Sequence, residues 1–330
     1  MKRKELTAIS LFAGIGGICQ GFMKYGVKIV FANDFDKSAC ITYKANFKHG
    51  IVEKPIEDVT IEEVPDADLV IFGFPCTSFS IAGYRKGFED EKSGNLFFEA
   101  FRIIKSKKPK AIFIENVKNL VSHDKGNTFK IIKDCLESEG YKLKYKVLNS
   151  MDYGNVPQNR ERIYIVGFLD HDMTDAFEFP EPIERTVAIH DITNPSEKKP
   201  DKYYYENSKY YPMLKEAMTN KDTVYQLRRI YVRENKSNVS PTLTANMGTG
   251  GHNVPLIIDD YGIRKLTPRE CLLLQGFPKN FIIPENVSNG QLYKQAGNSV
   301  TVSVIERIAK NMIDVINNNV IYKEVASDAE

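Results

Sequence analysis

The sequence predicts an α/β protein with a parallel sheet and a second, smaller domain of irregular structure. Five segments in the first half are nearly continuous runs of Val, Ile, Leu and Phe, and stretches with helical periodicity separate them. This alternation is typical of a parallel sheet that helices cover on both faces. After Phe168 the alternation stops, and proline, tyrosine and charged residues become frequent. The change indicates a domain boundary.

The expected elements follow one another along the chain. Strands are expected at residues 6–12, 27–33, 67–74, 109–116 and 162–168. Helices are expected between them, at residues 17–25, 36–46, 95–106 and 128–139. In the second half, helical periodicity returns at "TPRECLLLQGF" and at "GNSVTVSVIERIAKNMIDVI", so we expect further helices there.

The composition indicates a soluble globular protein. Of the 330 residues, 42% are apolar and 27% are charged, and no stretch approaches the ~18 uncharged apolar residues of a membrane span. The five cysteines are scattered without CxxC spacing, which argues for a reducing cytoplasm and against a disulfide framework or a zinc site. We therefore expect a cytoplasmic protein that contacts no membrane and holds no metal.

A glycine-rich turn, "SLFAGIGG", follows the first expected strand and opens a helix. Gly14, Gly16 and Gly17 would let a ligand approach the backbone at the start of that helix. Cys19 stands where a dinucleotide fingerprint has its third glycine, so the turn is nucleotide-like but is not a standard NAD loop. Asp34 ends the second strand, where an acidic residue can bind a ribose hydroxyl. The alternative is a plain strand–helix turn.

Two further chemically active residues fall at expected strand ends. Cys76 follows the third strand and Glu115 ends the fourth, and ligands bind at the carboxyl ends of parallel strands. No histidine near Cys76 could serve as its base, which argues against a thiol protease. Arg160 and Arg162 lie two residues apart at the fifth strand, so they would face one ligand together. Read singly, these residues could also be a packed thiol and solvated charges.

The stretch after Cys76, residues 77–95, is long, polar and punctuated by three glycines. A loop of this length in a compact domain usually serves as a lid or indicates a wrong assignment of elements. Arg85 and Lys86 within it could reach a phosphate.

Together, these blocks resemble the bacterial C5-cytosine-specific DNA methyltransferases of restriction–modification systems. The blocks stand in the order of that family, and they are "FAGIGG", "GFPCTSFS", "ENV", "QNRERIY", "RKLTPRECLLLQGFP" and "YKQAGNSV". The resemblance implies a Rossmann-like methyltransferase sheet with a target-recognition domain. It also implies a catalytic domain of residues 1–190 and 286–330, and a recognition domain of residues 191–285.

The resemblance implies S-adenosyl-L-methionine (AdoMet) as cofactor, S-adenosyl-L-homocysteine as product, and no metal. The positions that match AdoMet-lining residues of the family are Phe12, Gly14, Gly16, Gly17, Asp34, Asp58, Pro75, Leu96, Asn298 and Ser299.

The same resemblance implies catalytic roles. Cys76 would be the nucleophile, Glu115 would touch N3 and N4 of the target cytosine, and Arg160 and Arg162 would anchor that base. The cytosine has to leave the duplex to be reached, so residues 77–95 would close over the extruded base. One departure is Thr77, where the family most often has Gln. In relatives that Gln can help fill the gap that the extruded base leaves in the duplex, so other loop residues would have to fill it here. The chemistry is not affected.

Sequence choice is expected to belong to residues 191–285. The run "YQLRRIYVRENK" carries Arg228, Arg229 and Arg233, and basic side chains grip phosphates or read guanine edges. Without the resemblance, this run would be interpreted as a solvated face. Thr242, in "TLTA", matches a threonine that grips the backbone beside the target. The region looks similar to those that recognise short GC-rich palindromes.

The function implied is DNA (cytosine-5-)-methyltransferase, the modification half of a restriction–modification pair. Its partners would be double-stranded DNA and a cognate restriction endonuclease that acts separately, and a monomer is the simplest expectation. One alternative is a tRNA cytosine-C5 methyltransferase. A non-enzymatic binding protein is the other, although a binder has no need of Cys76 beside Glu115.

Overall fold

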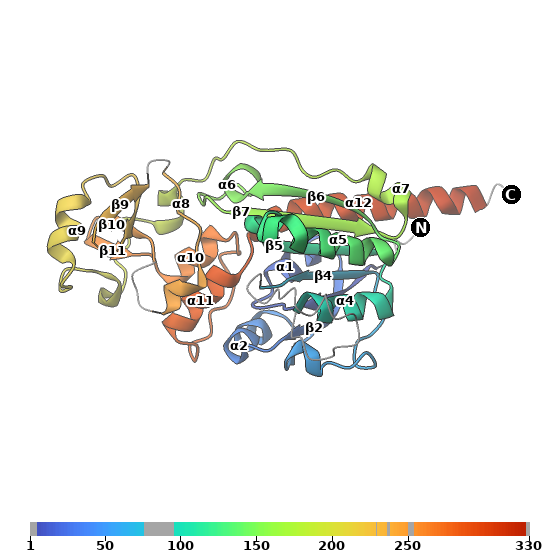
Figure 1. The fold of residues 1–330 in the computed structure, drawn as a ribbon. Coiled ribbons are helices and arrows are strands. Elements are labelled where there is room, and N and C mark those ends of the chain that lie inside the picture. The colour runs from blue at the N-terminus through green and yellow to red at the C-terminus, as the bar shows by residue number, and fades with distance from the viewer. Residues whose placement is uncertain (1–4, 76–95, 229, 236–237, 250–253, 328–330) are drawn as a thin grey trace. The chain divides into compact units, whose positions relative to one another are not determined.

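The computed structural model describes residues 5–75, 96–228, 230–235, 238–249 and 254–327 (Figure 1). The chain divides into two compact units. The first unit consists of residues 1–148, 161–180 and 305–330, and the second consists of residues 149–160 and 181–304. The second unit therefore has wider bounds than the predicted recognition domain of residues 191–285. That division by function stays a prediction.

The first unit is built on a seven-stranded sheet (Figure 1). Its strands are β1 (Thr7–Leu11), β2 (Lys28–Asp34), β3 (Val52–Glu53), β4 (Leu69–Gly73), β5 (Ala111–Val117), β6 (Lys142–Asn149) and β7 (Glu161–Phe168). Its helices are α1 (Gly17–Met23), α2 (Lys37–Asn46), α4 (Leu96–Lys107), α5 (Asn127–Ser138) and α7 (His171–Ala176), together with α12 (Val302–Ser327) from Ile305 onward.

The strand order is β3-β2-β1-β4-β5-β7-β6. Neighbouring strands from β3 to β5 are parallel, as predicted, but β7 pairs antiparallel with β5. The apolar pattern of β7 does not distinguish the two directions, because six of its eight residues are buried like those of its parallel neighbours. The sequence analysis also missed β6, an edge strand whose three lysines interrupt its apolar pattern.

Helices cover both faces of this sheet. Apolar residues of α4 and α5 pack with alternate residues of β1, β4, β5 and β7 in one buried cluster. On the other face, Phe22 of α1 meets Phe113 of β5 edge to face, with ring centroids 5.3 Å apart. Gly21 allows α12 to approach α1, since a Cβ there would lie 2.5 Å from a methyl carbon of Ile305.

The second unit contains a four-stranded sheet and short helices (Figure 1). The strands are β8 (Val224–Leu227), β9 (Val232–Asn235), β10 (Leu256–Asp259) and β11 (Gly262–Lys265), in the antiparallel order β11-β10-β8-β9. The helices are α6 (Ser150–Tyr153), α8 (Ile189–Thr193), α9 (Tyr211–Ala217), α10 (Pro268–Leu274) and α11 (Asn289–Asn298). The helix expected around 267–277 is thus confirmed, whereas α11 was not predicted.

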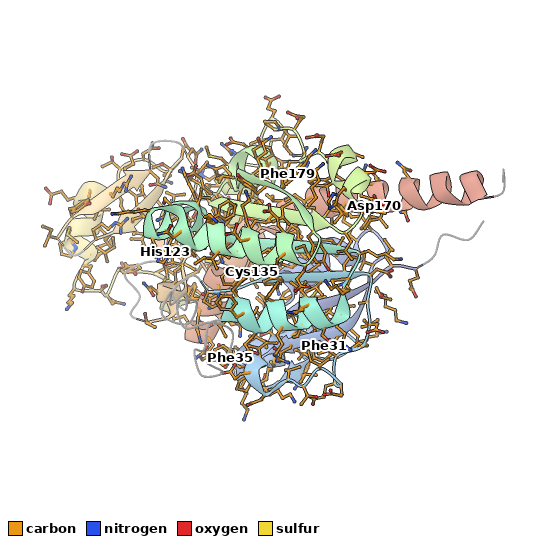
Figure 2. The ribbon with its side chains drawn as sticks, turned by 45° about the vertical axis from the view of Figure 1, so that its right-hand side comes forward. Phe31, Phe35, His123, Cys135, Asp170 and Phe179 are labelled. Carbon is orange, nitrogen blue, oxygen red and sulfur yellow. The ribbon has the colours of Figure 1, made fainter. Side chains whose placement is uncertain are left out.

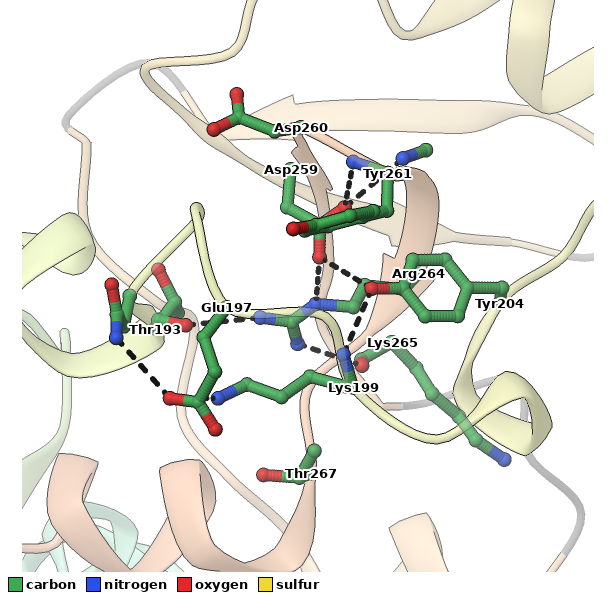
Figure 3. Close-up of polar contacts among 12 residues, drawn as sticks. Thr193, Glu197, Lys199, Tyr204, Asp259, Asp260, Tyr261, Arg264, Lys265 and Thr267 are labelled. Carbon is green, nitrogen blue, oxygen red and sulfur yellow. Dashed lines mark hydrogen bonds and ion pairs between the residues drawn. The ribbon is translucent and has the colours of Figure 1, made fainter.

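A buried ionic network joins the sheet of the second unit to α10 through Glu270. Figure 3 shows the bonds of Arg264 to Asp259 and Thr193 in this network. The fully buried guanidinium of Arg264 donates to Asp259 at 2.5 Å, to both carboxylate oxygens of Glu270 at 2.8 and 2.9 Å, and to the carbonyl of Thr193. The Tyr204 hydroxyl and two backbone N–H groups also donate to Asp259. One cation is thus held between two carboxylates, and Asp259 accepts three further hydrogen bonds.

Candidate active site

The strand order of the first unit reverses between β1 and β4. From β1 the chain goes to β2 and β3 on one side of the sheet, whereas β4 is followed by β5 on the other side. Ligands of open α/β sheets bind outside the carboxyl ends of the strands at such a point. The glycine-rich turn follows β1, and Phe74 and Pro75 follow β4. Because β1 and β4 are parallel neighbours, the glycine-rich turn and the segment that leads to Cys76 start beside each other.

The turn after β1 has a special backbone. Phe12, Gly14 and Gly16 have φ angles of 51°, 55° and 86°. For a phenylalanine this left-handed conformation is rare, and such outliers gather at functional sites. A Cβ at Gly16 would lie 2.2 Å from the ring of Phe47, whereas a Cβ at Gly14 would meet nothing within 4 Å. The turn is closed on the side of Gly16 and open at Gly14, and α1 begins at Gly17.

Asp34 ties this turn to the end of β2. Its Oδ2 accepts a hydrogen bond of 2.7 Å from the N–H of Gly14, and its Oδ1 accepts one of 2.8 Å from the N–H of Asp36. Burial raises the pKa of the Asp34 carboxyl, although these N–H groups oppose the shift. Each carboxylate oxygen has a second lone pair, so the group can also accept hydrogen bonds from a ligand.

The sequence analysis missed Phe35, which directly follows Asp34. It is 67% exposed, whereas Phe31 of β2 is buried, and Figure 2 labels both residues. An exposed ring at the carboxyl end of a strand can stack on a planar ligand. The signal that could have found it is an aromatic residue between two aspartates in "NDFD".

Glu115 lies opposite Gly73 in the pairing of β5 with β4. The carboxyl is 8% exposed, and a Cβ at Gly73 would lie 3.0 Å from its Oε2, which explains the glycine. Arg162 on β7 brings its Nε to 3.1 Å from Oε1 of Glu115. Oε1 nevertheless has no hydrogen-bond partner among the described residues, so the N–H of Arg162 does not point at it. One buried oxygen of this ion-paired carboxyl thus has no hydrogen bond among the described residues.

Asn116, which the sequence analysis did not select, holds the chain that leads to the predicted nucleophile. Its side-chain amide donates to the carbonyl of Phe74 at 2.8 Å, and its Oδ1 accepts from the N–H of Val117. The end of β4 is therefore tied to the end of β5 two residues before Cys76. The signal for this residue was its place within "ENV". Four predicted site residues lie outside the described residues: Cys76, Arg85, Lys86 and Arg229.

The structure does not bring Arg160 and Arg162 onto one strand. β7 begins at Glu161, and Arg160 belongs to the second unit. Its guanidinium, 2% exposed, donates to the carbonyls of Leu243 at 2.9 Å and Ser299 at 2.5 Å. The two arginines therefore do not lie on one strand as expected, because backbone carbonyls hold Arg160 just before β7 begins. That both arginines address one ligand stays a prediction.

Ser299 and the segment that carries Thr242 adjoin this arginine. Asn298 is exposed at the end of α11, and Ser299 is buried just after it. A Cβ at Gly297 would lie 2.1 Å from the backbone of Thr244, so α11 packs directly on the segment that carries Thr242. The hydroxyl of Thr242 donates to the carbonyl of Asn159 at 2.7 Å.

Three predicted residues of the first unit are less closely held. Asp58 is exposed in a single 3₁₀ turn at residues 56–58, Pro75 is exposed after β4, and Leu96 is the partly buried first residue of α4.

Comparison with known proteins identifies the family of the chain that carries these residues. The sequence profile of the C-5 cytosine-specific DNA methylases matches residues 6–314. The chain belongs to this family. Among the relatives of this cytosine methylase are two named type II methyltransferases. M.Bsp6I of Bacillus sp. (strain RFL6) is 59% identical over 93% of this chain and 98% of its own length. M.HaeII of Haemophilus aegyptius is 44% identical over 95% of each chain.

Solved structures of low sequence identity share the fold of this methylase. The methyltransferase EhMeth of Entamoeba histolytica has a TM-score of 0.73 at 19% identity, covering 95% of this chain and 99% of its own. DNMT2 of Spodoptera frugiperda has a TM-score of 0.72 at 20% identity, covering 93% and 99%. The predicted α/β methyltransferase sheet with a smaller second domain is thereby confirmed.

Family membership makes the chain a DNA cytosine-C5 methyltransferase, as predicted, with DNA as its substrate and AdoMet implied as its methyl donor. The tRNA alternative has less support, because these relatives are type II methyltransferases. None of the helices that the structure describes is long and apolar enough to cross a bilayer.

Proposed function

We propose that this methyltransferase modifies an extruded cytosine through a covalent bond between the Cys76 sulfur and C6 of the base. The observation that carries the proposal is the geometry of Glu115. Its carboxyl stands beside Gly73, which precedes Cys76 by three residues. Nε of Arg162 lies 3.1 Å from Oε1 of Glu115, and this buried oxygen has no hydrogen-bond partner among the described residues. A group that must hold the ring of a base beside a nucleophile needs such a placement.

The chemistry follows from the weakness of C5 as a nucleophile. Addition of the Cys76 thiolate to C6, while Glu115 gives a proton to N3, turns the ring into an enamine whose C5 can attack. AdoMet supplies the methyl group that C5 takes. Solvent water then takes the C5 proton, the electron pair of that C–H bond restores the C5–C6 double bond, the Cys76 thiolate leaves C6, and N3 returns its proton to Glu115. No histidine beside Cys76 is required, because the proton on N3 activates the ring as the electrophile.

We propose that AdoMet binds at the turn after β1. The open space at Gly14 allows a ligand near the backbone, the carboxylate of Asp34 has lone pairs for the ribose hydroxyls, and the exposed ring of Phe35 suits the adenine. The remaining proposed contacts are Phe12, Gly16, Gly17, Asp58, Pro75, Leu96, Asn298 and Ser299.

We assign different roles to the two arginines. Arg162 is proposed to act with Glu115 at the base. Arg160 is a positioning residue, because its guanidinium holds the carbonyls of Leu243 and Ser299, which adjoin the proposed DNA contact Thr242 and the proposed cofactor contact Asn298. Residues 191–285 are proposed to select the site, and Arg85, Lys86, Arg228, Arg229 and Arg233 are proposed to contact DNA.

The proposed biological role is protection of bacterial host DNA against a separately acting restriction endonuclease, by a cytoplasmic monomer. The names of the bacterial type II relatives support it.

Bisulfite sequencing of a plasmid that carries the gene, grown in a host without cytosine methylation, tests the proposal. We expect protected cytosines confined to one short motif, and none with the Cys76→Ala variant, which should still bind DNA. Turnover by that variant would refute the role of Cys76. No protection from soluble wild-type protein that binds AdoMet would refute the DNA assignment.

A further inference from the structure

The hairpin of β8 and β9 presents two different faces. Residues opposite each other in an antiparallel pair share a face, and the pairs alternate between the two faces. Tyr225 and Leu227 pair with Glu234 and Val232. On this face, Tyr225, Leu227 and Val232 pack into the apolar cluster that Leu214 of α9 completes. One face of the hairpin is therefore anchored to the second unit.

The opposite face is polar and uncovered near the turn. There Gln226 pairs with Arg233, and Arg228 lies across from Tyr231, to which its N–H donates at 2.8 Å. Gln226 and Arg228 are half-buried, and Arg233 and Tyr231 are exposed. β9 is the edge strand of the sheet, so nothing in that sheet covers its outer side.

The tip of this hairpin is unusually apolar for a solvated turn. Ile230 is 86% exposed, the largest exposure among the large apolar side chains that the structure describes, and Tyr231 is 54% exposed. Two adjacent exposed apolar residues between arginines are typical of a surface that a partner covers.

The polar groups of this face are arranged as hydrogen-bond donors. Arg228 donates from Nη2 to Oε1 of Gln226 at 2.9 Å. This bond uses one of the two lone pairs of the Gln226 oxygen. The amide N–H groups of Gln226 and the remaining N–H groups of Arg228 are left as donors for a ligand. Among the described residues Arg233 has no hydrogen bond or ion pair, and Glu234 beside it belongs to the anchored face. The face thus offers positive charge and donors, and hardly any acceptor.

We propose that the β8–β9 hairpin enters the major groove of the target DNA and that Arg228, oriented by Gln226, and Arg233 read guanines there. Guanine is the base whose major-groove edge offers two acceptors, O6 and N7, and the fork of an arginine binds both. A two-stranded ribbon fits the major groove, which is about 12 Å wide. Phosphates alone would not need the Gln226–Arg228 bond, which orients one guanidinium. This inference rests on the proposed role of residues 191–285 in target recognition.

The test uses duplexes that carry the site found by bisulfite sequencing, with each guanine replaced in turn by 7-deazaguanine, which lacks the N7 acceptor. With the wild-type enzyme, we expect kcat/KM to fall by about 10- to 100-fold at each guanine that is read. Arg228→Ala and Arg233→Ala should lower kcat/KM on the natural site similarly. Each variant should then show no further loss at its own 7-deazaguanine, because the contact is already gone.

Two controls separate base reading from general attraction. Arg233→Lys keeps the charge but loses the fork, so it should retain the salt dependence of binding and lose the discrimination. Lys215→Ala removes the same charge from α9, on the anchored side, and should leave site selection unchanged. Wild-type rates unaffected by 7-deazaguanine, or losses that add to those of the variants, would overturn the inference. Either result would leave the methyltransferase function intact, whereas the absence of any duplex methylation would refute that function first.

Discussion

The carboxyl edge of the first unit's sheet and the uncovered hairpin face of the second unit are built in opposite ways. At the sheet edge, the polar side chains are short and held by the backbone or by an ion pair, as in Asp34, Glu115 and Asn116. On the hairpin, the polar side chains are long, and Arg233 is exposed without a partner among the described residues. Bond-making chemistry needs fixed geometry, whereas a DNA contact can order its side chains on binding.

The hairpin nevertheless has a rigid support. The network around Arg264 joins β10 and β11 to α10, and β10 pairs with β8. In both regions, the functional side chains project from a well-packed backbone. The regions differ in how strongly neighbouring groups restrain those side chains.

The largest effect is expected at the sheet edge. Glu115→Gln keeps the shape of the side chain but removes the acid, so kcat should fall about 10²- to 10⁴-fold while the Kd for AdoMet stays nearly unchanged. Single-turnover kinetics and calorimetry measure the two quantities. Glu161→Gln, which changes an exposed carboxyl of the neighbouring strand, is the matched control. A collapse of AdoMet affinity in Glu115→Gln would move that residue to the cofactor site.

The ionic network that supports the sheet of the second unit can be disrupted at Arg264. Arg264→Met leaves Asp259 and Glu270 buried without their counter-charge, and breaking a buried pair in this way costs about 3–5 kcal/mol. Urea unfolding should show the loss. Adding Asp259→Asn and Glu270→Gln should restore part of the stability, because the uncompensated charges are then removed. An unchanged free energy of unfolding in Arg264→Met would show that the network does not support the sheet.

Phe35 tests whether an exposed side chain at the sheet edge can still be a binding group. Phe35→Ala should raise the Kd for AdoMet about 5- to 150-fold, as expected when a ring that stacks on a base is removed. The melting temperature should hardly change, since the ring is 67% exposed. Phe35→Tyr, which keeps the ring, should bind AdoMet like the wild type. Equal affinity of the alanine variant would exclude stacking.

The smallest effect concerns His49, which supports the glycine-rich turn through its neighbours. Its Nε2 lies 2.7 Å from the Tyr43 hydroxyl, and burial lowers its pKa below the usual 6.5. The unfolded chain then binds the proton more readily, so stability is complete above about pH 6.5 and declines as the pH falls through that value. Melting temperatures between pH 7.5 and 5.5 should show a slightly steeper decline for the wild type than for His49→Gln. Parallel declines would contradict this.

The sequence by itself was sufficient for the four parallel strands that carry the site. Their continuous apolar runs, which end at glycine or at polar residues, predict where a buried strand starts and stops, and a parallel sheet brings their carboxyl ends to one edge. Gly14, Asp34 and Glu115 can therefore be selected from the sequence alone. The order of the family's six blocks was sufficient for the activity.

Only the tertiary structure decided the direction of β7 and the partners of three arginines. An apolar pattern records that β7 is buried but not which way it runs, and the lysines of β6 conceal an edge strand. Nothing local distinguishes Arg160, which backbone carbonyls hold, from Arg162, which meets Glu115. The same holds for Arg264, a buried cation in a sequence region full of exposed ones. The partners of Arg160 and Arg162 come from distant parts of the chain, and the carboxylate partners of Arg264 come from the preceding strand and the following helix. Side-chain periodicity carries information about burial, not about which partner a charge will meet.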